Sequence, residues 1–462
     1  MNRIYNAETL EHTGKEVVVA GWVHARRDHG KIVFLDMRDR TGLLQVVVAD
    51  PQLVEQLKQH TVAREFVLQI TGTVNKRPDK LVNPHIATGS VELLTHGIKI
   101  LSTAETPPFE IEDDINVDEE IRMQHRYLDL RRPAMLKRFE LRHLVIHFIR
   151  SWMTEQGFIE VDTPLLTKDT PEGAREYIVP SRLHPGHGYA LPQSPQQFKQ
   201  LLMVAGLERY FQIAKCLRDE DPRGDRQPEF TQLDLEMSFV EREDVMALNE
   251  ELMIALVKAT QPNKKIQETP FPRLTYKEAV EKYQTDRPDL RKDKNDPDLL
   301  AFAWVTDFPF FEKDKKGEWT FTHNPFSAPL PESMDDLMHK QNIPGIVTSQ
   351  YDLVLNGFEV AGGSIRNHTA DALKKVFEIM GMSDERITKN FGHMLKAFSF
   401  GTPPHGGIAW GLDRVIALFA NQPNIREVIA FPKTGDGRDL MMGAPAQISD
   451  DKLRDLHLKK RE

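Results

Sequence analysis

The sequence predicts an α+β protein in which a small all-β domain precedes a larger domain of helices and antiparallel strands. The first hundred residues are a succession of short β-branched segments separated by glycines. From about residue 134 onward, long helical patterns alternate with strand patterns. A Pro-containing, acidic stretch lies between these two parts. We therefore expect a barrel domain at residues 1–104, a linker at 105–133 and a second domain at 134–462.

The N-terminal segments have the order of an OB barrel. Strands are expected at 17–23, 32–37, 43–49, 66–74 and 91–94, with a short helix at 52–60. Five strands with a helix after the third define an OB barrel, a frequent oligonucleotide-binding fold. An SH3-like barrel is the alternative that this pattern leaves open.

Composition narrows the class of protein. The longest apolar runs are far shorter than the ~20 residues of a membrane span, and the N-terminus lacks the apolar core of a signal peptide. The single cysteine, Cys216, excludes an internal disulfide framework and a multi-cysteine zinc site. We therefore expect a cytoplasmic protein without membrane contact. A net charge of −9 argues against a general nucleic-acid coat but allows local basic patches such as Arg26-Arg27.

An antiparallel hairpin is predicted between residues 210 and 239, where two alternating segments flank a charged turn. On its second strand Asp234 and Glu236 share a polar face, and Arg218 and Glu220 share a face at the end of the first. The apolar face of the second strand consists of Leu233, Leu235, Met237 and Phe239. Burying so many polar groups is costly without partners, so we expect this face to bind a ligand. A solvent-exposed sheet face is the alternative.

A short helix is expected to begin near Ser194. Ser194 and Gln197 have the spacing of a capping box, and Pro195 suits the first helical position. Gln196 and Lys199 lie three residues apart on a face distinct from the apolar stripe. Taken alone, such a lysine is most often an ordinary exposed residue.

A second hairpin turns at Asn356-Gly357, a strong signal for a two-residue turn. This turn pairs residue 354 with 359 and residue 352 with 361, so that Asp352 and Glu359 lie on one face within about 7–8 Å. Two such carboxylates repel each other unless a cation lies between them, and hard oxygen ligands favour Mg²⁺ completed by substrate phosphates. The glycines that follow allow backbone to approach a ligand before Arg366 is presented.

A glycine-containing strand precedes the last strong helix. Gly406, Gly407 and Gly411 lie in this strand, and Asp413 and Arg414 open the helix. An arginine near a helix start adds to the preference of that end for anions.

Together these segments resemble a known family. Residues 157–166 resemble motif 1 of the class II aminoacyl-tRNA synthetases, Arg218-Asp219-Glu220 with the next strand resembles motif 2, and residues 407–414 resemble motif 3. Residues 126–133, 193–200 and 226–232 are similar to segments of bacterial-type aspartyl-tRNA synthetases. The resemblance covers nearly the whole chain.

The resemblance implies an OB-fold anticodon-binding domain followed by a class II catalytic domain, an antiparallel sheet flanked by helices. It implies activation of L-aspartate with ATP and Mg²⁺, followed by transfer of aspartate to the 3′ end of tRNA-Asp and, in some members, tRNA-Asn. It also implies a homodimer, whose interface is formed by motif 1. No side chain needs to act as nucleophile or base, because the aspartate carboxylate itself attacks the α-phosphate.

Site residues also follow from the resemblance. Arg218 and Arg414 would be the catalytic pair that clamps the phosphates. The residues implied to contact ATP are Arg218, Asp219, Glu220, Gln227, Glu359, Gly411, Leu412, Asp413 and Arg414. Those implied for aspartate are Glu172, Gln196, Lys199, Asp234, His323 and Arg366. Asp352 and Glu359 would hold Mg²⁺, and Asp234 would orient Lys199.

In the barrel, the residues expected to contact tRNA are Arg27, His29, Phe34, Gln45, Arg77, Lys80 and Glu92. Phe34 lies on a polar face, opposite Val33 and Leu35, and could stack on a base. His29 resembles members that also charge tRNA-Asn, whereas Lys80 resembles strict members. We favour the relaxed type because His29 is nearer to Phe34 in the sequence.

The chain departs from the family pattern in two places. The domain that bacterial members insert between motifs 2 and 3 is missing, and only the polar segment 284–300 stands there. His323-Asn324 replaces a common pair of histidines. An asparagine–tRNA ligase of the same fold is the nearest alternative, which we disfavour because Lys199 and Arg366 would leave excess positive charge around a neutral amide. A non-catalytic tRNA-binding paralogue is disfavoured because both motif arginines are present.

Overall fold

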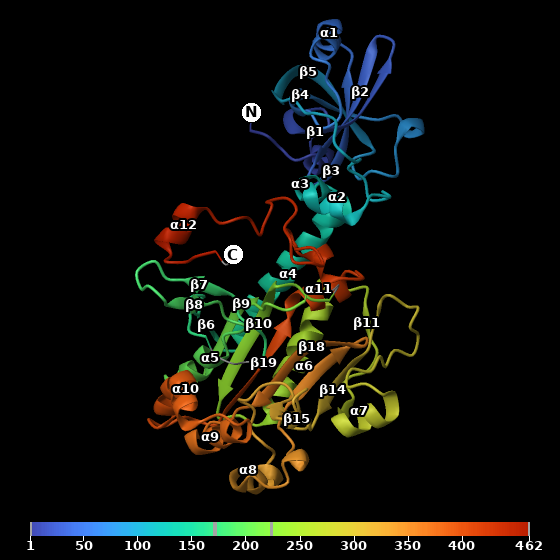
Figure 1. Cartoon of the computed structure of the whole chain (residues 1–462). Coiled ribbons are helices and arrows are strands. Elements are labelled where there is room, and N and C mark those ends of the chain that lie inside the picture. The colour runs from blue at the N-terminus through green and yellow to red at the C-terminus, as the bar shows by residue number, and fades with distance from the viewer. Residues whose placement is uncertain (1, 170–172, 222–224, 461–462) are drawn as a thin grey trace. The chain divides into compact units, whose positions relative to one another are not determined.

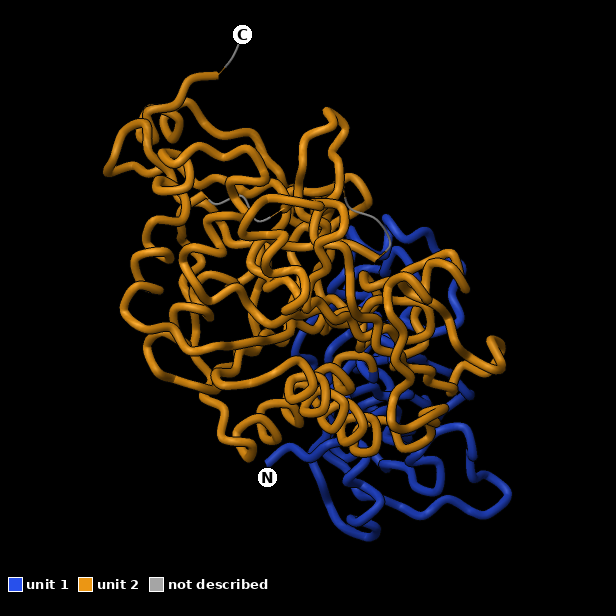
Figure 2. Tube along the Cα trace, turned by 90° about the horizontal axis from the view of Figure 1, so that it is seen from below, with its two compact units in different colours: residues 1–137 blue, residues 138–462 orange. Residues whose placement is uncertain are grey.

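The computed structural model describes residues 2–169, 173–221 and 225–460. The chain forms two compact units, residues 1–137 and residues 138–462 (Figure 2). This division lies close to the predicted start of the second domain at residue 134. The finer division into a barrel at 1–104 and a linker at 105–133 remains a prediction.

The first unit contains a closed five-stranded barrel in the order β1-β2-β3-β5-β4. Its strands are β1 (Glu16–His29), β2 (Ile32–Asp39), β3 (Gly42–Val48), β4 (Val67–Lys76) and β5 (Val91–Ser102). Helix α1 (Pro51–Gln59) follows β3, and the side chain of Asp50 caps it by accepting from two backbone amides. This is the OB order that the sequence predicts.

The barrel interior is apolar, as the alternation along β2 predicts. Val33, Leu35 and Met37 are buried in it, whereas Phe34 between them is half-buried on the opposite face. The rest of the first unit contains the short helices η1 (Ala7–Glu11), η2 (Asp79–Leu81), α2 (Glu119–Gln124) and α3 (Arg126–Asp129).

The second unit is built on an eight-stranded sheet in the order β12-β14-β17-β18-β19-β10-β9-β6 (Figure 1). The sheet is antiparallel except for the β12–β14 and β6–β9 pairs near its edges. Its strands are β6 (Ile159–Glu160), β9 (Arg209–Leu217), β10 (Glu229–Ser238), β12 (Arg273–Thr275), β14 (Phe302–Thr306), β17 (Tyr351–Leu355), β18 (Phe358–Ile365) and β19 (His405–Gly411).

Short strands pair outside this sheet. They are β7 (Ile178–Pro180) with β8 (Gly188–Ala190), β11 (Lys265–Ile266) with β13 (Leu299–Leu300), and β15 (Phe311–Lys313) with β16 (Trp319–Phe321). The boundary between the two units falls within helix α4 (Pro133–Glu155). The other helices of the second unit are α5 (Gln196–Val204), α6 (Arg242–Thr260), α7 (Tyr276–Tyr283), α8 (Met334–His339), α9 (Ala370–Ile379), α10 (Asp384–Phe398), α11 (Leu412–Phe419) and α12 (Asp450–Asp455). Single turns form η3 (Pro331–Ser333), η4 (Ile343–Gly345) and η5 (Ile425–Val428).

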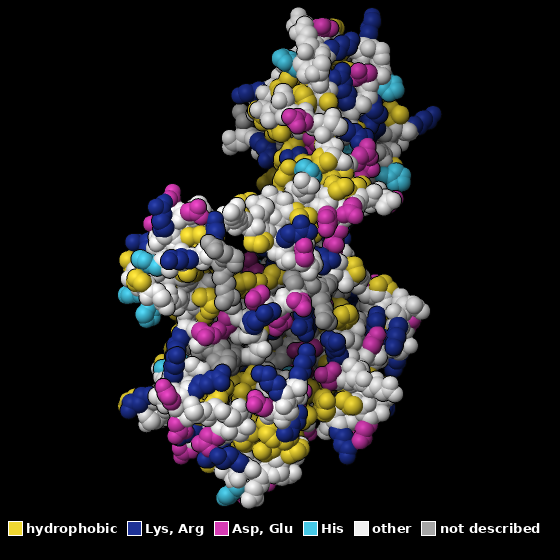
Figure 3. All heavy atoms as spheres, in the orientation of Figure 1, with side chains coloured by type: hydrophobic (Ala, Val, Ile, Leu, Met, Phe, Trp, Pro, Cys, Tyr) yellow, Lys and Arg dark blue, Asp and Glu magenta, His cyan; other side chains and the backbone are white. Residues whose placement is uncertain are grey.

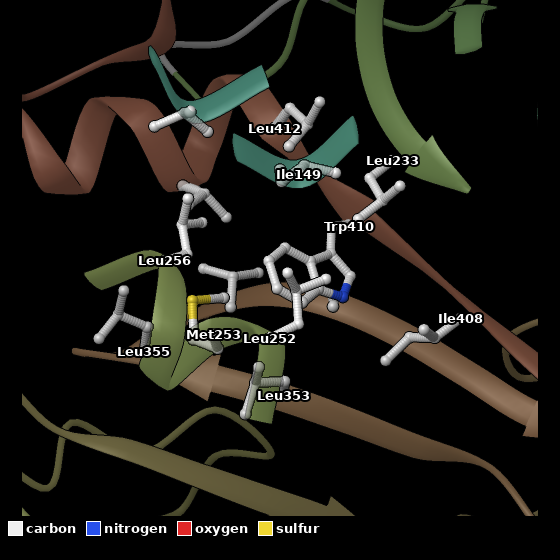
Figure 4. Close-up of a cluster of buried hydrophobic side chains, with 14 of the residues drawn as sticks. Ile149, Leu233, Leu252, Met253, Leu256, Leu353, Leu355, Ile408, Trp410 and Leu412 are labelled. Atoms are coloured by element: carbon white, nitrogen blue, oxygen red, sulfur yellow. The ribbon is translucent and has the colours of Figure 1, made fainter. Parts of the chain in front are cut away.

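One face of the large sheet carries the main apolar core. Trp410 of β19 is fully buried there, and Leu252 and Met253 of α6 lie beside it (Figure 4). Its indole N–H donates to Asn249 Oδ1 over 2.8 Å, which satisfies the one polar atom of the ring. Because this face is apolar, the polar residues of β10 and β18 point to the other face.

Two local predictions are wrong. Phe239 does not share the apolar face of β10, because the strand ends at Ser238 and Phe239 turns out with a φ of 59° and is 67% exposed. Ser194 and Gln197 do not form a capping box. Pro195 takes the N-cap position of α5, so the Ser194 hydroxyl lies one residue outside and no side chain caps the helix.

Over the described part of the chain, none of the helices has the length and apolarity that a membrane crossing requires. Acidic and basic side chains are interspersed on the visible face of each unit (Figure 3).

Candidate active site

A cavity of about 630 Å³ opens on the polar face of the large sheet. It is within the range of small-ligand sites, about 300–1,000 Å³. The predicted residues that line it are Gln196, Lys199, Arg218, Glu220, Gln227, Asp234, His323, Glu359, Arg366, Gly411, Asp413 and Arg414. Asp219, Asp352 and Leu412 are not among the described lining residues. Glu172 lies outside the described residues.

Four buried charges form what we call the charge-paired cluster: Lys199, Asp234, Glu236 and Arg366. Lys199 Nζ lies 2.8 Å from Asp234 Oδ1 and 3.2 Å from Glu236 Oε2. Arg366 donates from Nε and Nη2 to the two oxygens of Glu236, over 2.8 and 3.1 Å. All four side chains are at most 3% exposed, so the protein neutralises these charges internally.

The electrostatics of this cluster follow from burial and pairing. Burial alone would raise the pKa of Glu236, but the charges of Arg366 and Lys199 lower it to about 2. Burial raises the pKa of Asp234, although Lys199 opposes this shift. Neither oxygen of Asp234 has a well-directed hydrogen bond within the described residues, despite the ion pair. Asp234 therefore offers acceptors to a cationic ligand.

Glu236 is the site residue whose role the sequence does not reveal. It lies on the predicted polar face of β10, but its partner Arg366 is 130 residues away. With Asp234, Glu236 balances the charges of Lys199 and Arg366. The excess positive charge expected from the sequence is therefore absent. The argument against asparagine as the substrate that rested on this excess is wrong. Position 407, in the segment that resembles motif 3, requires glycine, because a Cβ there would lie 2.1 Å from Glu236 Oε2.

Arg218 and Arg414 provide less completely paired cations. The Arg218 guanidinium lies over the Phe230 ring at 5.0 Å, a cation–π contact. Arg414 donates from Nη1 to the backbone oxygen of Glu359 and lies 3.8 Å from an Asp225 carboxylate oxygen. The buried Nε of each arginine has no hydrogen-bond partner among the described residues. Both are therefore suited to an anionic ligand.

The two carboxylates predicted to hold a metal converge. A Cβ on Gly362 would lie 2.9 Å from Asp352 Oδ1 and 3.4 Å from Glu359 Oε1, so both carboxylates reach the space beside this glycine. The pairing of 354 with 359 is confirmed, but Asp352 pairs with Gly362 rather than residue 361, because a bulge shifts the register. Asp352 and Glu359 together with Arg218 and Arg414 are called the open cluster below.

The chemistry of this pair fits a hard divalent cation. Burial and the charge of Glu359 raise the pKa of Asp352 well above its usual value, and Gln350 donates to it over 2.6 Å. A cation would relieve that repulsion. Two carboxylates leave most of the shell to water and phosphate, as Mg²⁺ sites do.

Several residues predicted to contact ATP are instead hydrogen-bonded or packed within the protein. Asp413 accepts from Arg142 over 2.5 Å and from the backbone N–H of Thr231 over 2.8 Å. The Gln227 amide bonds the backbone of Lys433 in both directions, over 3.0 and 2.7 Å. Leu412 is fully buried in the core.

Of the remaining predicted contacts, Glu220 and His323 line the cavity. Glu220 accepts from Arg226 over 2.9 Å, and the backbone N–H of Asp219 donates to the backbone carbonyl oxygen of Arg175. His323 packs edge-on against Phe308 at 4.7 Å, and burial lowers its pKa, which favours a neutral ring. Asn324 accepts from the N–H of Phe326 over 2.9 Å, so it shapes the turn.

On the barrel, the residues expected to contact tRNA fall into two groups and one separate residue. His29 meets Phe34 edge-on at 5.7 Å, and Arg27 is the cross-strand partner of Phe34. In the second group Gln45 donates to Glu92 over 3.0 Å, and Arg77 lies 3.7 Å from the same oxygen. Lys80 is exposed in η2.

Comparison with known proteins adds two matches. Residues 17–101 match the OB-fold nucleic acid binding domain. Residues 118–435, well over half the chain, match the tRNA synthetases class II (D, K and N). The chain belongs to this class II family. It is therefore an aminoacyl-tRNA synthetase, and its barrel is of the OB type.

Curated relatives of this class II chain match along nearly its whole length. It is 40% identical to the aspartate–tRNA(Asp/Asn) ligase of Dehalococcoides mccartyi, with 98% of each chain covered. It is also 40% identical to the aspartate–tRNA ligase of Geobacillus kaustophilus, with 99% of each covered. The first alignment runs over 589 positions, whereas this chain has 462 residues. The relative therefore contains residues without a counterpart here, in agreement with a missing insertion.

Solved structures of the same class share the fold. The asparaginyl-tRNA synthetase of Pyrococcus horikoshii with asparaginyl-adenylate has a TM-score of 0.75 at 23% identity, and 94% of this chain and 98% of that chain are covered. The aspartyl-tRNA synthetase of Entamoeba histolytica has a TM-score of 0.73 at 22% identity, with 94% and 91% covered.

Proposed function

We propose that this class II synthetase is an aspartate–tRNA ligase that activates L-aspartate with ATP and transfers it to the 3′ end of tRNA-Asp. The charge-paired cluster carries this proposal. Arg366 donates from Nε, Nη1 and Nη2, so among the described residues two of the five N–H groups of an arginine have no acceptor. Within the part of the chain that the structure describes, Lys199 Nζ faces Asp234 and Glu236, which leaves at least one of its three N–H groups for a ligand.

Selectivity for aspartate follows from these remaining donors. The side-chain carboxylate of aspartate has only acceptors and can receive all of them. The amide of asparagine would turn its NH₂ group toward at least one of them and leave buried donors unpaired, which costs about 1–3 kcal/mol each. This argument replaces the one from excess positive charge.

The proposed reaction relies on positioning and charge stabilisation. The α-carboxylate of aspartate attacks the α-phosphorus of ATP, an oxygen–phosphorus bond forms, and the bond to pyrophosphate breaks. Arg218 and Arg414 stabilise the charge on the phosphates. Asp352 and Glu359 would hold Mg²⁺, which supplies further neutralisation of phosphate charge when bound. The 3′-terminal hydroxyl of tRNA then displaces AMP from the adenylate.

ATP–pyrophosphate exchange with each of the twenty amino acids tests this proposal. We expect exchange that depends on L-aspartate and Mg²⁺. Exchange with asparagine or lysine at comparable efficiency would refute the assignment of the substrate.

For the barrel we propose anticodon recognition with Phe34 as the stacking residue. The edge-on contact of His29 with Phe34 supports a role for His29 beside the stacked base, and we therefore favour charging of tRNA-Asn as well as tRNA-Asp. Charging of the two transcripts with labelled aspartate tests this. A thousandfold preference for tRNA-Asp, about 4 kcal/mol, would contradict it.

We further propose a cytoplasmic homodimer. Strand β6 is an edge of the large sheet, and Ile159, Leu165 and Leu166 in the motif 1 segment are about half exposed. A segment that begins at a sheet edge and exposes apolar residues is suited to a two-fold contact. Light scattering at micromolar concentration should give the mass of a dimer, and a monomer would count against it.

A further inference from the structure

A chain of hydrogen bonds leads from the backbone to the rim of the cavity. His405 Nδ1 lies 2.8 Å from the carbonyl oxygen of Pro403. His405 Nε2 lies 3.2 Å from the side-chain amide of Gln200, and that amide lies 3.1 Å from the amide of Gln196. Gln200 and His405 are fully buried, whereas Gln196 lines the cavity.

The buried end of this series of hydrogen bonds determines which group donates and which accepts in each bond. The carbonyl oxygen of Pro403 can only accept, so His405 Nδ1 carries the proton and donates. Burial lowers the pKa of His405, so the ring is neutral near pH 7 and Nε2 is an acceptor. The NH₂ group of Gln200 must therefore face His405, and its oxygen faces Gln196.

The same logic orients Gln196. Because the oxygen of Gln200 can only accept, Gln196 must turn its NH₂ group toward it. Gln196 Oε1 is then the atom left for the cavity. The reversed amide would bring two oxygens together on the inner side and present N–H groups to the ligand.

We propose that His405 and Gln200 are positioning residues that hold the Gln196 amide with its oxygen toward the cavity, where it accepts a hydrogen bond from the α-ammonium group of the amino acid. This rests on the proposed function, because it takes aspartate as the ligand. The protein thereby selects the α-ammonium through a directed neutral acceptor, in addition to the carboxylate of Asp234.

Succinate provides the probe, because it has both carboxylates of aspartate but no ammonium group. The ratio of the succinate and aspartate dissociation constants, measured by calorimetry on the full chain, reports recognition of the ammonium alone. Gln200→Met removes the relay with little change in shape, and the ratio should fall about tenfold, or 1.4 kcal/mol. Gln200→Glu can still accept from Gln196, and with one proton held between its carboxyl group and His405 Nε2 it can also bond His405. The ratio should therefore stay within about threefold of the parent, under 1.4 kcal/mol.

His405→Phe is the second variant and should reproduce the Gln200→Met result, which keeps the test independent of the folding of one variant. An unchanged ratio in Gln200→Met or His405→Phe would overturn the proposal, as would equal weakening of both ligands, because that indicates only a structural role. Binding of aspartate by the parent tests the proposed function, whereas the ratios among variants test the relay.

Discussion

The two charged clusters of the cavity are built differently. In the charge-paired cluster, both cations meet carboxylates within 3.2 Å, and the four side chains are almost inaccessible. In the open cluster, the Nε atoms of Arg218 and Arg414 have no partner among the described residues, and Asp352 has a raised pKa.

This difference indicates how each cluster is completed. The charge-paired cluster is already balanced, so it is preorganised for a ligand that brings both a carboxylate and an ammonium. The open cluster has positive and negative groups that lack counterparts, and phosphates with a divalent cation would supply both. Under the proposed function, the charge-paired cluster is therefore formed before binding, and ATP with Mg²⁺ would complete the open cluster.

The largest effect should come from removing Arg366. Arg366→Leu leaves Glu236 without its guanidinium partner, which costs about 3–5 kcal/mol in a buried pair. Aspartate-dependent exchange should fall by more than a hundredfold, while ATP binding by calorimetry stays largely intact. Arg438→Leu, which removes an exposed ion pair with Asp436, is the matched control. A loss under about tenfold, or 1.4 kcal/mol, would mean that Arg366 is not the partner of the aspartate carboxylate.

A substitution in the open cluster should slow the reaction and leave aspartate binding unchanged. Arg218→Ala removes a cation that stacks on Phe230, and the rate of exchange should fall about 10²–10³-fold, as for other donors that stabilise a transition state. Aspartate binding measured without ATP should not change. If aspartate binding weakened as much as exchange, the two clusters would not be separable.

A smaller effect concerns acid stability. The pKa of Glu236 is lowered to about 2 from 4.5, so its stabilisation is fully present above pH 4.5 and is lost as the pH falls toward 2. Glu236→Gln should lower the free energy of unfolding at pH 7 by about 1–3 kcal/mol. The difference from the parent in urea unfolding should shrink as the pH falls from 4.5, and a constant difference would contradict the pairing.

The smallest expected effect is a gain in stability rather than a loss. Because the pKa of Asp352 is raised by burial and Glu359, its ionisation costs stability, and that cost grows as the pH rises through the raised pKa. Asp352→Asn should therefore raise the melting temperature in chelator at pH 8, by roughly 2–4 °C per kcal/mol. It should also lose Mg²⁺-dependent exchange. A lower melting temperature would show that the carboxylate is not under strain.

The sequence predicts local features well and distant pairings poorly. The barrel order and the convergence of Asp352 with Glu359 follow from β-branched segments and the Asn356-Gly357 turn. The bulge that shifts their register leaves no sequence signal. Glu236 with Arg366 and Gln200 with His405 lie 130 and 205 residues apart, so no spacing rule could join them.

Helix and strand ends were also predicted less well than their interiors. Phe239 continues the apolar alternation of β10, yet its backbone turns out of the sheet. Ser194 has the residue type of a cap, but Pro195 takes the cap position, so the helix begins at Gln196, one residue later than expected.

Calorimetric titration of the free protein tests the central claim most directly. L-aspartate and ATP are each titrated with and without Mg²⁺, in the absence of the other substrate. We expect aspartate to bind equally with and without Mg²⁺, and ATP to bind at least about tenfold more weakly in chelator, a difference of 1.4 kcal/mol. Aspartate binding that requires Mg²⁺ or ATP would contradict a preformed charge-paired cluster.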